Sequence, residues 1–498
     1  MRAAGSLYAE QMTGHASTVR DAGTDAAWRA FARLAAVRRD VFFLDAGAAA
    51  TTGRSLVGVG TPAAVADALQ APLAGDPSRR VGDDRLVGGY VGWFSYEDGV
   101  RASGDAPIAP GGERSAVLRV EAVAVFDHGA GNVTVEEGVA GAGDDLRGVL
   151  GHEASDPLLF SDVPLGQRAA RARTTPDEYA VLIARCRAEI RAGNAYQLCL
   201  TTRFSIDAPD IDALAVYARL RASVGAQRGG FVRIGDTALL SASPEQFLGV
   251  RGGTVTTRPI KGTRPRGSDA VSDQRLAREL AESAKERAEN VMIVDLMRND
   301  LARACVPGTV AVPALLEVES YPHVHQLVST VTGTLRPGTT LGDLLRVAFP
   351  AGSMTGAPKL SAITILHALE REPRGMYAGC FGWIGAGASV ASGSGSGSGS
   401  DFADADLAMV IRSIVLVGSG AEARAYVGAG GGITWGSVAA DEVAEVALKA
   451  RGPLAALGAA LPEDWVATLG EALADDGARG EASIIDPRPH HAVPATSR

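Results

Sequence analysis

Lysine is scarce in this chain of 498 residues. Only four of its 48 basic residues are lysines, and the rest are arginines. An arginine side chain stays protonated, whereas a lysine can lose its proton and attack carbon. A chain this rich in arginine has other ways to place positive charge on its surface. Lys261, in the stretch TTRPIKGTRPRG, is therefore a candidate for amine chemistry, with a solvated surface charge as the simpler alternative.

Cysteine is scarce as well, and long apolar runs and net positive charge are missing. The four cysteines are scattered without C-x-x-C spacing, which predicts reduced, mostly buried thiols in a cytoplasmic protein. No apolar run is long enough to span a membrane, and the N-terminal stretch has no uninterrupted apolar core. We therefore expect neither a membrane span nor a signal peptide. The net charge of −9 argues against a nucleic-acid-binding protein.

The pattern along the chain predicts three parts. Short apolar runs between turn residues indicate a sheet-rich N-terminal portion over residues 1–150. Mixed helices and strands follow over residues 173–451, beginning with the helix signals of TPDEYAVLIARCRAEIRAG. Residues 452–498 are expected to form a tail whose end is disordered. The Gly/Ser run at 392–400 predicts a flexible loop, to which the sequence assigns no role.

Two pairs of carboxylates have helical spacing. Glu286 and Glu289 form one pair, and Glu442 and Glu445 form the other, with Lys449 one turn later. Residues three apart share a helix face, and two such faces opposite each other would offer the oxygen ligands that Mg²⁺ prefers. The alternative is two solvated faces with ordinary salt bridges. The neighbouring apolar stretches VMIVDL and VALKA favour buried helices and so favour the metal site.

Three further stretches carry weaker signals. The glycines of YVGAGGGITWGS allow backbone amides to approach an anion, although a tight turn is the simpler alternative. GSMTGAPK fails as a phosphate-binding P-loop because Ala357 and Pro358 separate Gly356 from Lys359. Glu245, in SASPEQF, indicates little by itself.

Taken together, these stretches resemble the chorismate-utilising enzymes, the family of anthranilate, aminodeoxychorismate, isochorismate and salicylate synthases. The resemblance runs from about residue 175 to residue 450 in family order, and more weakly through 27–145. The motifs that carry it are NAYQLCLTTRF, SASPEQFL, RPIKGTRPRG, KERAENVMIVDLMRNDL, HQLVSTVTG, FPAGSMTGAPK, GCFGWIG, LAMVIRSIVL and YVGAGGGITWGSVAADEVAEVALKA.

The resemblance implies an α+β fold in which two large antiparallel β-sheets pack together and helices flank them. It also implies a chorismate site that requires Mg²⁺. Glu289 and Glu445 look like direct metal ligands, with Glu286 and Glu442 supporting them. Glu245 looks like the general acid that protonates the leaving 4-hydroxyl group. The implied substrate contacts are Thr263 beside the ring and, around the enolpyruvyl carboxylate, Tyr377, Arg412, Gly430 and Lys449.

Two positions distinguish members of the family. Water-adding members carry a lysine base where this chain has Gln197, so the resemblance favours ammonia as nucleophile. Lys261 lies in PIKGT, the form that is similar to bacterial aminodeoxychorismate synthases, whereas anthranilate synthases read PIAGT. The implied role of Lys261 is attack on ring carbon C2, which directs ammonia to C4. We expect burial and nearby cations to lower its pKa from about 10.4 toward neutrality.

A third position departs from many members of the family. The residue before Leu-Val-Ser is Gln326 rather than histidine, and His325 lies one residue earlier, on the opposite face of the expected strand. That absence suits an enzyme that keeps the enolpyruvyl group.

The resemblance therefore predicts the large subunit of an aminodeoxychorismate synthase, serving p-aminobenzoate synthesis for folate or an antibiotic. A glutamine amidotransferase subunit would supply ammonia. Anthranilate synthase component I is the first alternative, and a non-catalytic paralogue that only binds chorismate or an aromatic amino acid is the second.

Overall fold

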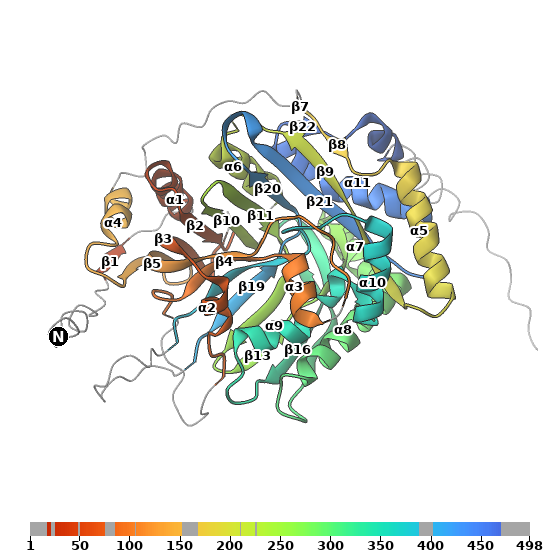
Figure 1. Ribbon diagram of the computed structural model, residues 1–498, viewed down its shortest axis with the longest axis horizontal. Helices are drawn as coiled ribbons and strands as arrows, with labels where there is room; N and C mark the ends of the chain where they lie inside the picture. Colours follow the sequence, from red (N-terminus) through yellow and green to blue (C-terminus); the bar gives the residue numbers. More distant parts are fainter. Residues whose placement is uncertain are drawn as a thin grey trace, which may run out of the picture.

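The computed structural model describes residues 17–20, 25–47, 50–74, 85–104, 106–151, 168–209, 211–224, 227–387 and 402–469. Figure 1 shows twisted sheets at the centre of the molecule with helices around them. The Gly/Ser run at 392–400 and the end of the expected tail, 470–498, lie outside the described residues. No helix among the described residues is long and apolar enough to cross a membrane.

Among the described residues, twenty strands pair continuously into one antiparallel sheet, which is folded so that it forms two sheets sharing one strand. In order of pairing, the first sheet contains β1 (Ser17–Arg20), β6 (Asn132–Glu137), β5 (Ala116–Asp127), β3 (Arg54–Ala63), β2 (Val41–Asp45), β10 (Arg228–Ile234), β11 (Thr237–Ser243), β20 (Ser413–Val417), β21 (Arg424–Ile433) and β9 (Gln197–Asp207), with the short β8 (Arg171–Ala172) and β17 (Gly356–Ala357) beside β9.

The second sheet continues from β5 through β4 (Tyr90–Phe94), β18 (Cys380–Ile384), β19 (Ala405–Met409), β12 (Gln246–Arg251) and β13 (Thr254–Thr257) to β16 (Val324–Thr334). Along β16, β14 (Ile260–Pro265) follows β13 on one edge and β15 (Ala311–Ser320) occupies the other. A separate parallel pair joins β7 (Arg168–Ala169) to β22 (Ala459–Ala460).

The shared strand β5 is the corner between the sheets. Its second half pairs with β6 and β3, and its first half pairs with β3 and β4. The register of β3 against β5 shifts between Val59 and Gly60, and such a bulge bends a strand and increases its twist. A side chain at Gly60 would meet the backbone of Arg119 at 2.4 Å, so only glycine fits this bend.

The sheets pack on each other through apolar side chains from both. Phe42 and Val232 of the first sheet share a buried cluster with Trp93 and Phe381 of the second. Alternating side chains of each strand point into this layer, as a sandwich requires. The predicted α+β fold with packed antiparallel sheets and flanking helices is confirmed.

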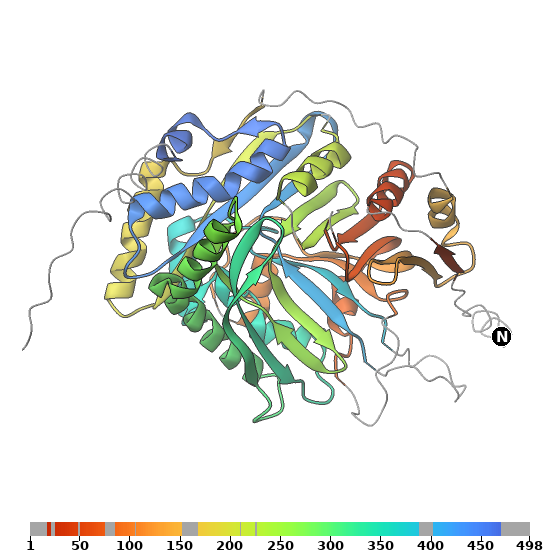
Figure 2. The same cartoon turned by 180° about the vertical axis from the view of Figure 1, so that it is seen from behind.

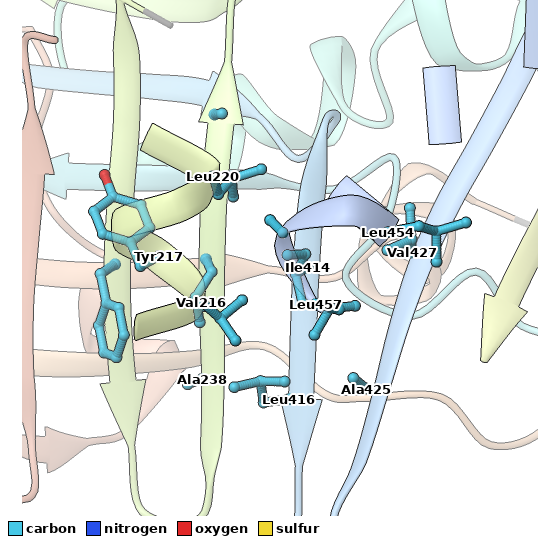
Figure 3. Close-up of a cluster of buried hydrophobic side chains, with 14 of the residues drawn as sticks. Val216, Tyr217, Leu220, Ala238, Ile414, Leu416, Ala425, Val427, Leu454 and Leu457 are labelled. Atoms are coloured by element: carbon cyan, nitrogen blue, oxygen red, sulfur yellow. The ribbon is translucent and has the colours of Figure 1, made fainter. Parts of the chain in front are cut away.

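Helices cover the outer face of each sheet. Against the first sheet lie α1 (Ala26–Val37), α4 (Asp144–Leu150), α5 (Pro176–Arg191), α6 (Ala213–Val224), α10 (Lys359–Glu370) and α11 (Ala439–Ala456). Figure 3 shows how α6 and α11 do this: Val216 and Leu220 of α6, and Leu454 of α11, meet Ile414 and Val427 of the strands below. In Figure 2 both helices cross in front of these strands.

The second sheet is covered by α2 (Val65–Leu69), α3 (Tyr96–Ser103), α7 (Ala270–Glu282), α8 (Ala284–Ala302) and α9 (Leu341–Ala348). The single-turn helices η1 (Gly352–Met354) and η2 (Gly420–Glu422) lie in connections. The predicted helix after Thr175 is present as α5, and Thr175 and Glu178 form a capping box at its start.

The predicted parts of the chain are joined to one another through the sheets. Strand β2 of the N-terminal portion pairs with β10, and β4 pairs with β18, so 1–150 and 173–451 share both sheets. The expected boundary at 451 falls inside α11, which continues to Ala456. The start of the expected tail also packs on the core, since Trp465 is fully buried against Phe204 and Tyr179.

Candidate active site

Lys261 lies on β14 with its side chain turned into the protein. Only 15% of that side chain is exposed, and its Nζ is 3.9 Å from Oε2 of Glu289 on α8. A Cβ atom at Gly432 of β21 would lie 3.4 Å from the same Nζ. The amine is thus enclosed by β14, α8 and the end of β21, on the inner side of the glutamate-bearing helix.

The prediction that the pKa of Lys261 is lowered toward neutrality is wrong. Burial alone lowers the pKa of this amine, but the carboxylates of Glu289, Glu245 and Glu445 outweigh burial and raise its pKa above the ordinary value. Sequence reasoning counted nearby cations and could not count the carboxylates brought to the amine by the fold. In this arrangement Lys261 carries a proton that it must lose before it can attack carbon.

Glu245 lies at the break between β11 and β12, where the chain passes from the first sheet to the second. Its carboxyl group is buried, and Ser353 of η1 donates a hydrogen bond to Oε1 at 3.0 Å. Burial raises the pKa of Glu245 to about 7, although Lys261, the Ser353 hydrogen bond and Lys449 each act to lower it. A carboxyl group with this pKa can both hold and release a proton near neutral pH.

Gln197 begins β9 and is almost completely buried. Neither its amide nitrogen nor its amide oxygen has a hydrogen-bond partner among the described residues. A Cβ atom at Gly432 would lie 2.5 Å from Nε2, so the amide fills the space beside Lys261 that this glycine leaves open. A buried amide without partners costs free energy, and a bound ligand would supply those partners.

The two carboxylate pairs lie on helices, as their spacing predicts, and the helices face each other. Glu286 and Glu289 belong to α8, Glu442 and Glu445 belong to α11, and Lys285 of α8 bonds to Glu442 across the gap. Every glutamate of the set also faces a cation. The pairs, with nitrogen-to-oxygen distances, are Glu442 with Lys285 (3.2 Å), Glu445 with Lys449 (2.7 Å), Glu289 with Lys261 (3.9 Å) and Glu286 with Arg264 (4.0 Å).

The chemistry of this set fits a divalent cation better than its present geometry does. Four carboxylates, two of them buried, are the hard oxygen donors that Mg²⁺ takes. However, no three of the His, Cys, Asp or Glu side chains in the described part of the chain stand close enough together to hold a metal ion. The carboxylates point to their cationic partners instead, so a metal ion would have to replace some of these contacts.

The residues expected to hold the enolpyruvyl carboxylate gather along the free edge of β21. Strand β20 leaves β21 after Val427, and beyond that point β21 pairs with β9 alone among the described strands. The ring of Tyr377 fills the space over Gly428, which lacks a side chain. Lys449 donates a hydrogen bond to the carbonyl oxygen of Gly430 at 2.9 Å.

Arg412 lies at the second crossing between the sheets, between β19 and β20. Its φ of 52° is in the left-handed region, which is unusual for a residue other than glycine and common at functional sites. Burial lowers the pKa of Arg412, while Tyr377 and Glu445 act to raise it. The guanidinium group therefore belongs to the same neighbourhood as Tyr377 and the α11 carboxylate.

Thr263 stands apart from this group. It lies on the outer part of β14 and is exposed, with Gln326 as its strand partner. His325 is engaged elsewhere, because Ser320 contacts its Nδ1 at 2.8 Å and Asp273 contacts its Nε2 at 2.9 Å. His325 therefore has no free ring nitrogen to offer the site.

Two positioning side chains escaped the sequence analysis. Ser353 lies in GSMTGAPK, which was tested only as a P-loop; Lys359 of that stretch is instead buried against Asp300 at 2.7 Å. Lys285 was visible as one of four lysines and precedes Glu289 by one helical turn. Its partner Glu442 is 157 residues away, so the spacing alone could not reveal the contact.

A groove of about 1690 Å³ opens elsewhere, between strands of the N-terminal portion and the β12–β16 region. Asp45, Arg228 and Tyr321 are among its lining residues, and none of the site residues predicted from the sequence lines it. The size of this groove therefore gives no support to the candidate site, which rests on its chemistry.

Comparisons with known proteins identify the family of the chain. Residues 52–455 match the family model described as chorismate binding enzyme. The chain is 37% identical over 388 residues to an aminodeoxychorismate synthase of Streptomyces griseus, covering 75% of this chain and 50% of that protein. It is also 37% identical over 415 residues to anthranilate synthase component 1 of Streptomyces coelicolor, covering 78% of this chain and 76% of that protein.

Among solved structures, anthranilate synthase component I of Streptococcus pneumoniae superposes with a TM-score of 0.64 at 26% identity, covering 91% of this chain and 95% of that one. This chain spans about half the length of the aminodeoxychorismate synthases that it matches. The chain is equally identical to a relative named aminodeoxychorismate synthase and to one named anthranilate synthase component 1, so sequence identity does not decide between these two activities. The family match over residues 52–455, together with the fold, shows that the chain belongs to the family of chorismate-binding enzymes.

Proposed function

We propose that this chain is the large subunit of an aminodeoxychorismate synthase, which converts chorismate and ammonia into 4-amino-4-deoxychorismate and water. The observation that carries the proposal is the enclosed amine of Lys261, which lies beside Glu289 and shares the space at Gly432 with Gln197. An alanine at this position would leave the ring carbon C2 open, whereas the amine blocks it and directs nitrogen to C4.

One proton transfer prepares both reactive groups. Glu245 has a pKa of about 7 and Lys261 is protonated, so moving one proton from the amine to the carboxylate yields a free amine and a neutral acid. Glu245 then protonates the 4-hydroxyl group, which leaves as water. The Lys261 nitrogen forms a bond to C2, both ring double bonds shift (C1=C2 to C1=C6 and C5=C6 to C4=C5), and the C4–O bond breaks.

Ammonia completes the exchange. It attacks C4, both ring double bonds shift back, and the bond between C2 and Lys261 breaks. The amine takes up the proton that the new amino group releases, which restores the starting charge of Lys261. The unpartnered amide of Gln197 can orient the ammonia, because an amide donates and accepts hydrogen bonds but cannot deprotonate water.

We propose Mg²⁺ as the cofactor and a glutamine amidotransferase subunit as the source of ammonia. Glu289 and Glu445 would bind the metal ion, with Glu286 and Glu442 in support, and the ion would anchor the ring carboxylate of the substrate. The product would serve p-aminobenzoate synthesis, for folate or for an antibiotic. Arg412, Tyr377, Lys449 and the Gly430 backbone would hold the enolpyruvyl carboxylate, and Thr263 would contact the ring.

The test is product identification with chorismate, Mg²⁺ and ammonium for the wild type and the Lys261→Ala variant. We expect the wild type to form the 4-amino product without releasing pyruvate. The variant should lose at least about two orders of magnitude in that product, since nucleophilic catalysis is lost. A Lys261→Ala variant that makes the 4-amino product at the full rate would show that the amine has no covalent role.

Anthranilate synthase remains the second candidate because the similarity to component 1 enzymes is equally strong. That reaction liberates pyruvate from the same substrate. A coupled assay for pyruvate therefore separates the two: stoichiometric pyruvate with the wild type would establish the alternative and remove our proposal.

A further inference from the structure

Lys285 holds a carboxylate that a metal ion would need. Its Nζ lies 3.2 Å from Oε1 of Glu442, which also accepts a hydrogen bond from Ser437 at 2.8 Å. The Glu442 side chain is only 2% exposed, whereas the Lys285 side chain is 50% exposed. The lysine thus reaches from solvent to the edge of the carboxylate cluster.

The position of Lys285 is central to that cluster. It lies in the first turn of α8, and Glu289 follows one turn later on the same face. Glu442, Glu289 and Glu445 all attract its positive charge. A positive side chain in the field of three carboxylates stands where a divalent cation would be attracted.

The other two lysines of the cluster are held more firmly. Lys261 is enclosed between β14 and β21, and Lys449 bonds both to Glu445 and to the carbonyl oxygen of Gly430. Lys285 has the long flexible stem and the exposed path that allow it to leave. Repulsion between its charge and a divalent cation would favour its departure.

An observation outside the carboxylates points to a ligand in the same space. Gln197 is 1% exposed, both of its amide atoms lack partners in the part of the chain that the structure describes, and Gly432 places this amide beside Lys261. Buried polar atoms are normally satisfied. The inner wall of the cluster is therefore built to receive polar groups that the described residues do not supply.

We propose that Lys285 is a displaceable counter-ion, which competes with a divalent cation for Glu442. The inference rests on the metal site of the proposed function and adds a mechanism that limits occupancy of that site. Lys285 would keep the buried carboxylate paired when the cation is scarce, and would swing into solvent when the cation binds.

The first test measures Mn²⁺ binding by electron paramagnetic resonance and by calorimetry, without substrate. We expect Lys285→Met to bind Mn²⁺ about tenfold more tightly than the wild type, because one competing positive charge is gone. Lys285→Arg keeps the charge and should remain near the wild type. Arg298→Met is the matched control, since it removes one charge from an exposed pair on the same helix.

The second test uses the wild type alone and so does not depend on the folding of a variant. The amines are labelled with acetic anhydride at increasing Mn²⁺ concentration, and labelling of each lysine is followed by peptide mass spectrometry. Lys285 should react faster as Mn²⁺ is added, while Lys359, buried against Asp300, serves as the internal reference.

The outcomes separate the two ideas. A wild type that binds no Mn²⁺ overturns the metal site and the competition together. A wild type that binds Mn²⁺ while Lys285→Met binds it with equal or lower affinity overturns the competition alone. Labelling of Lys285 that stays constant or falls with Mn²⁺ has the same meaning.

Discussion

At the scale of single residues, the proton held by Glu245 sets the pH range of the proposed reaction. Its pKa of about 7 results from burial, opposed by Lys261, by the hydrogen bond from Ser353 and by Lys449. In the proposed reaction Glu245 must first accept the proton of Lys261, which only its carboxylate form can do, so activity should rise as the pH rises through this pKa. Any change that raises the pKa of Glu245 should therefore move the onset of activity to higher pH.

Ser353→Ala is the variant that tests this. The hydroxyl group of Ser353 favours the carboxylate form, so its removal should raise the pKa of Glu245 and move the rising limb of the pH profile upward by roughly 0.5 to 1 pH unit. The measurement is the ratio of variant to wild-type kcat/KM at each pH, in which the titration of ammonium cancels. Ser353→Thr keeps the hydroxyl and should restore the wild-type profile; a flat ratio for Ser353→Ala would refute the link.

The residue scale also shows where prediction from the sequence stops. Spacing placed Glu289 and Glu445 on helices, and motif resemblance selected Lys261. The charge of Lys261 was missed, since it depends on carboxylates from the β11–β12 connection, α8 and α11 that converge only in the folded chain. Local sequence carries no information about which sign of charge will surround a buried amine.

At the scale of elements, the end of β21 makes room for the site. Its glycines receive neighbouring side chains: Tyr377 lies over Gly428, a Glu442 oxygen stands 2.9 Å from where the Gly431 Cβ would be, and Gln197 fills the space at Gly432. The sequence analysis interpreted the same glycines as a cradle for an anion. A strand without Cβ atoms can make room either for neighbouring side chains or for an anion. The pairing of β21 with β9 fixes which face of β21 the neighbouring side chains fill.

We predict that Gly432→Ala displaces the Gln197 amide, because the new Cβ atom would stand 2.5 Å from its Nε2. The expected cost is about 1–3 kcal/mol in the free energy of unfolding and more than about tenfold in ammonia-dependent kcat/KM. Denaturant unfolding and the ammonium assay measure the two effects. Gly436→Ala is the control, since nothing lies within 4 Å of its Cβ. Wild-type activity in Gly432→Ala would mean that the position of Gln197 is unimportant.

Helices differ in how clearly the sequence marks where they begin. Helix α5 begins at a capping box and could be predicted to within a residue or two. Helix α1 was not predicted: Asp25 precedes it without making a capping hydrogen bond, and its first turn has no acidic residue. Its stability comes from packing, because Trp28, Phe31 and Leu34 are buried. The residues that signal the start of a helix do not reveal such tertiary contacts.

At the scale of the whole molecule, one buried arginine ties the N-terminal portion to the site wall. Arg374 donates to the carbonyl oxygens of Met354 and Cys199, pairs with Glu370 at 2.7 Å, and its guanidinium lies 4.4 Å from the ring centre of Tyr96. It therefore joins η1, β9, α10 and α3. Because η1 also carries Ser353, this contact positions the partner of Glu245.

Arg374→Met should destabilise the whole fold by about 3–5 kcal/mol, since it leaves the carboxylate of Glu370 buried without its partner. Denaturant unfolding measures the loss. Adding Glu370→Gln should recover part of the stability, because the unpaired charge disappears. Arg346→Met, in the exposed pair with Asp343, should change stability by less than about 0.5 kcal/mol. An equally small loss for Arg374→Met would contradict this role.

The pairing of β2 with β10 has a consequence for how the chain is made. Phe43 pairs with Phe231, 188 positions later, and at about 5–20 residues per second the ribosome needs roughly 10–40 s to deliver the partner. During that interval β2 exposes an open edge, which is a template for aggregation. Contacts this distant also slow folding. Recovery of the protein from cells should therefore depend on chaperones that bind nascent chains, far more than its final stability would suggest.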